Sequence, residues 1–150
     1  MASKFRRVGT PVFQGSEAVC WAAAMEYWLS VTPGRTKMKA DELVRLYAKK
    51  NPDGSLDPIT EWPTVRDENG LMSVNIGSDN LNTTTVLNAL DKGNLFLGYE
   101  IPGKAFGHCV VIYGIIDDKL QFMDPAIGSF RYRDISAFSG AKMTIAWPSR

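Results

Sequence analysis

The two halves of this chain have different hydrophobic periodicities, and this difference constrains the fold more than any other feature. In the first half, apolar residues recur every three to four positions, which is the pattern of one face of a helix. The clearest of these stripes consists of Trp21, Ala24, Met25, Trp28 and Leu29. In the second half the apolar runs are short, and the run 108–116 is apolar on both faces, as in a central strand. Helices followed by an antiparallel sheet predict an α+β fold.

Turn and capping residues set the approximate limits of these elements. Ser16 is a candidate N-cap of the first helix, which Pro33 and its neighbours end. The stretch 56–70 stays ambiguous, because Pro58 could open a short helix that Pro63 would limit. The first dozen residues are predicted to be an extended lead-in. The predicted helices cover about 17–31, 39–50 and 83–91, and the predicted strands about 71–76, 95–101, 108–116, 119–123, 129–133 and 143–147.

Size and charge narrow the class of protein. The 150 residues can bury a sizeable core and fit one domain that spans 1–150. The 17 Lys and Arg residues nearly balance the 16 Asp and Glu residues, so nucleic acid is not an expected partner. Neither a membrane span nor a secretory signal peptide is expected, because no apolar run is long enough. We therefore expect the protein in the cytoplasm, or secreted by a route that needs no signal peptide.

The residues available for chemistry include two cysteines, Cys20 and Cys109, and one histidine, His108. They are too few for a disulfide scaffold or a zinc site, so no metal and no cofactor is expected. A cysteine becomes a nucleophile when a helix N-terminus or a neighbouring imidazolium holds it as a thiolate. Cys20 lies near the start of the first predicted helix, and His108 is the candidate for the imidazolium. Taken one at a time, they are more readily explained as a core cysteine and a surface histidine.

The combination of residues favours the functional interpretation. Gln14 lies six residues before Cys20, which an aromatic residue follows directly. Further along, a Gly-His pair at 107–108 opens an apolar strand, and an Asp-Pro pair at 124–125 follows another. In these motifs and their order, the chain resembles the papain-like cysteine peptidases over residues 14–128. It is most similar to a compact bacterial branch that includes leader-processing and effector peptidases.

The resemblance implies catalytic roles for four residues. Cys20 would attack a carbonyl carbon as a thiolate, and His108 would share its proton and later protonate the leaving amine. Asp124 would accept the other imidazole N–H and orient the ring. Gln14, with the backbone N–H of Cys20, would form the oxyanion hole. Cys109 alternates to the face opposite His108, so we expect it to be buried and inert.

Pairing of His108 with Asp124 makes a geometric prediction. The two side chains must lie on the same face of neighbouring strands. A regular two-residue turn at Asp117 and Asp118 would put Asp124 on the wrong face. The hypothesis therefore predicts either a longer loop over 114–118 or a β-bulge near Gly114.

The implied function is that of a cysteine peptidase, which hydrolyses a peptide or amide bond through a Cys-His-Asp triad and a thioester. A role as a secreted bacterial effector or toxin follows from the same resemblance. The expected partners are a protein or peptide substrate and an inhibitor or immunity protein. A glutamine deamidase or transglutaminase-like acyl-transfer toxin would use the same triad, so this alternative stays open. A non-catalytic binding module that keeps the fold is a second alternative.

Overall fold

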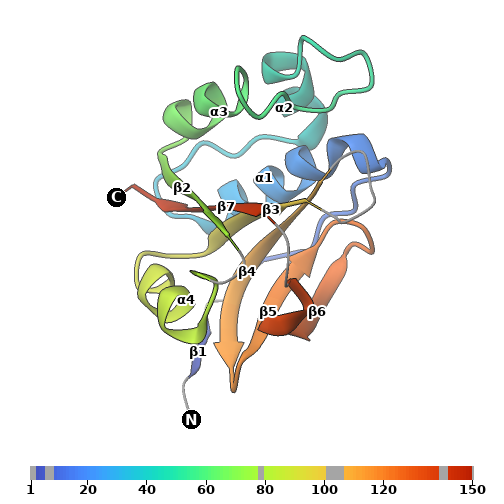
Figure 1. Ribbon diagram of the computed structural model, residues 1–150. Coiled ribbons are helices and arrows are strands. Elements are labelled where there is room, and N and C mark those ends of the chain that lie inside the picture. The colour runs from blue at the N-terminus through green and yellow to red at the C-terminus, as the bar shows by residue number, and fades with distance from the viewer. Residues whose placement is uncertain (1–2, 6–8, 78–79, 101–106, 139–141, 150) are drawn as a thin grey trace.

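The computed structural model describes residues 3–5, 9–77, 80–100, 107–138 and 142–149 (Figure 1). Its helices are α1 (Cys20–Val31), α2 (Ala40–Tyr47), α3 (Trp62–Glu68) and α4 (Thr83–Leu90), with 3₁₀ turns η1 (Glu17–Val19) and η3 (Ile135–Phe138). Its strands are β1 (Ser3–Phe5), β2 (Leu71–Gly77), β3 (Leu95–Tyr99), β4 (His108–Ile116), β5 (Lys119–Asp124), β6 (Ser129–Asp134) and β7 (Lys142–Pro148). Among the helices in these ranges, none combines the length and hydrophobicity that a membrane span needs.

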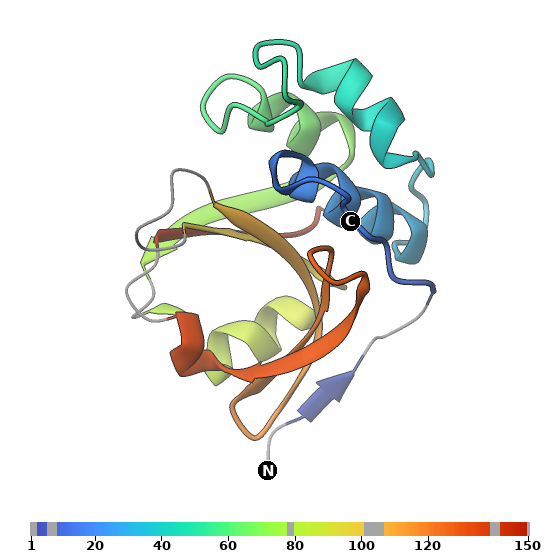
Figure 2. The same ribbon diagram turned by 90° about the vertical axis from the view of Figure 1, so that its right-hand side faces the viewer.

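The strands form one antiparallel sheet in the order β2-β7-β3-β4-β5-β6, with β1 paired to β4 outside that order. Two strands share one edge of β4: β3 pairs with residues 108–112, and β1 pairs with residues 114–116. The sheet is strongly curved, with α1, α2 and α3 outside the curve and α4 inside it (Figure 2). Helices and an antiparallel sheet confirm the predicted α+β class.

The sheet separates two hydrophobic layers, and α1 is buried along most of its length. The layer on the α1 side includes Trp21, Trp28, Leu43, Val65, Phe96, Val111 and Met123. The layer on the α4 side includes Val86, Leu90, Leu97, Val110, Ile112, Leu120, Phe122 and Ile145. Consecutive residues of β4 therefore contribute to different layers, as the alternation of side chains along a strand requires. This explains why the run 108–116 is apolar on both faces.

Most predicted helices and strands are present, and the differences have local causes. Pro63, expected to limit a helix, instead lies in the first turn of α3, where its missing N–H breaks no helical hydrogen bond. Ser16 precedes the turn η1 and makes no side-chain capping bond, and the α-helix begins only at Cys20. The lead-in, expected to be merely extended, contributes strand β1.

The hairpin of β4 and β5 combines a two-residue turn with a β-bulge. Asp117 and Asp118 form the turn with φ angles of 50° and 65°, as a type I′ turn requires. The pairing register then shifts by one residue just before Gly114. Because of this shift, Asp124 lies on the same face as His108, one diagonal step away from it. The bulge near Gly114 is one of the two outcomes that the sequence predicted for a histidine–aspartate pair.

Candidate active site

Cys20 lies where α1 begins, and only 5% of its surface is exposed. The turn η1 leads into the helix, and the backbone N–H of Cys20 donates to the carbonyl oxygen of Glu17 in that turn. The thiol is thus at the positive end of the helix dipole, where a thiolate is favoured. Its Sγ lies 4.0 Å from the carbonyl oxygen of Gly107, which directly precedes β4. The starts of α1 and β4 therefore meet in space.

His108 is the first residue of β4 and pairs with Tyr99 of β3. The Tyr99 ring packs edge-on against the imidazole, with ring centroids 5.9 Å apart. The neighbouring Gly107 allows β3 and β4 to approach each other where Tyr99 and His108 pair. A Cβ at Gly107 would lie 2.5 Å from the Tyr99 carbonyl oxygen. The glycine of the Gly-His motif therefore has a steric role in placing the histidine.

Asp124 ends β5, and its carboxylate is buried. Its Oδ1 accepts hydrogen bonds from His108 Nε2 at 2.7 Å and from the backbone N–H of Ala126 at 3.0 Å. Its Oδ2 accepts a hydrogen bond from Arg131 Nη1 at 3.1 Å. Three donors thus satisfy a carboxylate that would be costly to bury alone. His108 and Asp124 are in contact, as the sequence predicted.

The pKa values of Cys20, His108 and Asp124 all differ from their usual values. A hydrogen bond from the Cys109 thiol, supported by the hydrogen bond and charge of His108, outweighs burial and lowers the pKa of Cys20 from 9.0 to about 5. Burial lowers the pKa of His108, but hydrogen bonds with Asp124 and Cys20 dominate and raise it from 6.5 to about 9. Burial also opposes ionisation of Asp124, yet its three donors lower its pKa below 3.8. Near neutral pH the site holds a thiolate, an imidazolium and a carboxylate.

A backbone hydrogen bond places Gln14 beside the residue that follows Asp124. Its N–H donates to the carbonyl oxygen of Pro125, the residue after Asp124, at 2.9 Å. Its side-chain Oε1 is buried and has no hydrogen-bond partner among the described residues. The other expected oxyanion donor, the N–H of Cys20, is already bonded to Glu17, so it would reach a substrate only by sharing its hydrogen. Gln14 is thus near the site, and its role as a donor stays a prediction.

Two contacts of the site, made by Cys109 and Arg131, were not predicted from the sequence. Cys109 packs against the layer on the α1 side, away from His108 as expected, but it is half-buried rather than buried. Cys20 begins α1, which packs against the same layer, so the two thiols hydrogen-bond, and this bond together with burial raises the pKa of Cys109. Arg131 belongs to an alternating arginine–aromatic strand, a pattern that gives no sign of a buried acidic partner. In both cases the missing information was which strands and layers are neighbours.

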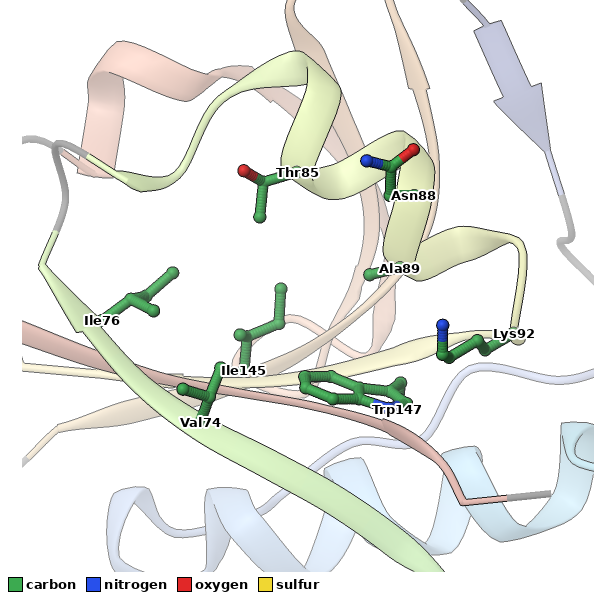
Figure 3. Close-up of a pocket in the computed structure, with 8 residues that line it drawn as sticks. All are labelled: Val74, Ile76, Thr85, Asn88, Ala89, Lys92, Ile145 and Trp147. Carbon is green, nitrogen blue, oxygen red and sulfur yellow. The ribbon is translucent and has the colours of Figure 1, made fainter.

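A separate hollow of about 300 Å³ lies between α4 and the β2 edge of the sheet (Figure 3). It is lined by Val74, Ile76, Thr85, Asn88, Ala89, Lys92, Ile145 and Trp147. None of the sequence-predicted site residues is among them. The candidate active site therefore lies where α1 meets β4 and β5, away from this hollow.

A cysteine at a helix N-terminus, facing a histidine and an aspartate on an antiparallel sheet, defines the class of papain-like cysteine peptidases. A solved structure shares the fold: the peptidase domain of Streptococcus ComA, a bi-functional ABC transporter involved in a quorum sensing pathway. It superposes with a TM-score of 0.65 over 93% of this chain and 98% of that one, at 19% sequence identity. No match was found among curated proteins.

Residues 6–143 match the family described as papain-like cysteine protease AvrRpt2. The match covers most of the chain, and the protein belongs to this family. It is a papain-like cysteine peptidase, which confirms the class of enzyme that the motifs predicted.

Proposed function

We propose that this peptidase hydrolyses peptide bonds through a triad of Cys20, His108 and Asp124. The observation that carries the proposal is the place of one imidazole between two partners. His108 Nε2 lies 2.7 Å from Asp124 Oδ1, and the same ring hydrogen-bonds with the sulfur of Cys20. Because Nε2 is taken by the carboxylate, Nδ1 is the nitrogen left to serve the thiolate. Nucleophile and proton donor are thus both charged before a substrate binds.

The reaction has two stages. The thiolate of Cys20 attacks the substrate carbonyl carbon, and the C–N bond breaks as His108 gives a proton to the leaving amine. A thioester remains on Cys20, and His108 is then neutral. Water next attacks the thioester and gives a proton to His108. The C–S bond breaks, which restores the thiolate–imidazolium pair, and the product leaves as a carboxylic acid that loses its own proton to solvent. Gln14 is proposed to donate its amide N–H to the oxyanion in both stages.

The proposal is tested by the reactivity of Cys20 itself. We expect iodoacetamide to label Cys20 rapidly at pH 6, because its pKa of about 5 leaves it mostly as a thiolate. In His108→Ala the pKa should rise toward its usual value, and the labelling rate at pH 6 should fall at least about ten-fold. Peptide mapping separates label on Cys20 from label on Cys109. A slow, ordinary thiol profile that His108→Ala leaves unchanged would contradict the triad.

The bond that is broken needs a separate measurement. After incubation with a cell extract, new protein N-termini that arise with the wild type but not with Cys20→Ala support a peptidase. A glutamine deamidase would instead add about one mass unit to an uncut substrate. Intact mass of the affected protein distinguishes the two.

We also propose that the substrate is a protein of another cell, reached by a secretion route without a signal peptide. The support is the resemblance of the motifs to effector peptidases. Since the thiolate is formed before substrate binds, the producing cell would restrain it with an inhibitor or immunity protein. Cleavage of proteins in the producer's own extract, at the rate seen in a host extract, would argue for a housekeeping role in the cytoplasm.

A further inference from the structure

We propose that Arg131 is a positioning residue of the reaction, which acts on the Cys20 thiolate through Asp124 and His108. The proposal rests on the proposed triad and extends it by one strand. The series of contacts then runs across three neighbouring strands. His108 comes from β4, Asp124 from β5 and Arg131 from β6. Arg131 touches neither the thiolate nor, by this proposal, the substrate.

The strand register places Arg131 beside the carboxylate. Asp124 pairs with Ser129 of β6, and Arg131 pairs with Phe122 two residues earlier on β5. Arg131 is therefore a diagonal neighbour of Asp124 on the same face of the sheet. His108 approaches the same carboxylate diagonally from β4, on the opposite side. The carboxylate is thus held between two cationic groups.

Arg131 fixes the orientation of the carboxylate because it binds the oxygen that His108 does not use. Rotation about the bond between Cβ and Cγ of an aspartate is soft. Ala126 and His108 both donate to Oδ1, and Arg131 donates to Oδ2 at 3.1 Å. With both oxygens held, Oδ1 stays directed at His108 Nε2. Without Arg131, the donors that remain all bind one oxygen, and the carboxylate can turn.

Charge gives a second reason for the role of Arg131. The Asp124 side chain is only 7% exposed, and that of Arg131 is 31% exposed. A carboxylate buried to this degree needs a counter-charge. His108 supplies one only while it is an imidazolium, and it becomes neutral once it has protonated the leaving amine. An arginine keeps its charge throughout, so Arg131 keeps Asp124 ionised during the thioester stage.

The test is a double-mutant cycle read by the rate of Cys20 alkylation at pH 6. We expect Arg131→Gln to lower this rate about ten-fold, as loss of a supporting partner typically does. In an Asp124→Asn background, the same substitution should have little further effect, because Arg131 acts through the carboxylate. Arg131→Lys, which keeps the charge but loses the planar fork, should give an intermediate rate. The matched control is Arg133→Gln, an exposed arginine of β6 on the same face, which should leave the rate unchanged.

The outcomes separate this proposal from the triad on which it rests. If the wild type shows no fast labelling that depends on His108, the proposed function fails. If it does, and Arg131→Gln labels like the wild type, the proposal for Arg131 alone is overturned. An equal loss in the Asp124→Asn background, or in Arg133→Gln, would also overturn it. If Arg131→Gln does not fold, as judged by circular dichroism, Arg131→Lys decides, and an unchanged rate in that variant counts against the proposal.

Discussion

The reactivity of Cys20 depends on its neighbours as much as on its place at the start of α1. The hydrogen bond from Cys109 is the largest cause of its lowered pKa, ahead of the hydrogen bond and charge of His108. The two neighbours act differently in chemistry. The Cys109 thiol is a donor that stabilises the thiolate but carries no proton to the substrate, because its own pKa is raised. His108 stabilises the thiolate and also supplies the proton for the leaving amine.

Replacement of Cys109 separates these two contributions. In Cys109→Ala the thiolate loses a donor, so we expect the acid limb of Cys20 alkylation to move from about pH 5 to higher pH. The variant should keep its dependence on His108. Cys109→Ser retains a donor of similar size and should stay closer to the wild type. The pH dependence of iodoacetamide labelling measures both, and an acid limb that neither variant moves would show that the thiol pair does not influence Cys20.

At the scale of secondary structure, the site depends on how closely β3 and β4 approach at their ends. Gly107 lies where these strands meet, and His108 follows it directly. A Cβ at Gly107 would come within 2.5 Å of the backbone carbonyl oxygen of Tyr99. The contact is with backbone, so it is relieved only by moving one strand away from the other.

Gly107→Ala should therefore damage both the sheet and the site. We expect it to lower the free energy of unfolding by about 1–3 kcal/mol, the usual cost of overpacking, and to slow Cys20 labelling at pH 6. Gly77→Ala is the matched control, because a Cβ at Gly77 meets no atom of the described residues within 4 Å. Urea unfolding measures the change in stability, and the rate of Cys20 labelling at pH 6 without urea measures the change at the site. Equal stability and labelling in the two variants would show that the strands adjust without cost.

The elements also show how far the sequence could predict this structure. Hydrophobic periodicity located most helices and strands because it depends on neighbours in the sequence. The short strand β1 carries no such pattern, and its pairing with β4 is a contact between residues more than a hundred positions apart. The bulge near Gly114 was predictable only as one of two options, since it followed from the requirement that His108 and Asp124 share a face. The motifs selected Cys20, His108 and Asp124 as candidate site residues, and their catalytic roles stay predictions. The contacts of Cys109 and Arg131 depend on the order of strands and layers, which the motifs do not give.

At the scale of the whole molecule, the two hydrophobic layers bring the two halves of the site together. Cys20 comes from α1 on the outer side of the curved sheet, and the histidine and aspartate come from the sheet itself (Figure 2). The lowered pKa of Cys20 therefore exists only while α1 is packed on the sheet. Trp28 links these two parts, because it is fully buried and its indole N–H donates to the carbonyl oxygen of Asn94, just before β3, at 2.9 Å.

Trp28→Phe tests whether this packing holds the site together. The variant leaves the buried carbonyl of Asn94 without its donor, which should cost about 1–3 kcal/mol of unfolding free energy. We expect the urea midpoints for circular dichroism and for loss of fast Cys20 labelling at pH 6 to fall together. In the absence of urea, the labelling rate should match the wild type, since no side chain of the site has changed. Tyr132→Ala, at a position that is 65% exposed, should leave both midpoints in place. If fast labelling in Trp28→Phe disappears well before the helical signal, then Cys20 leaves His108 while the helices are still folded, and the site does not unfold together with the packed layer.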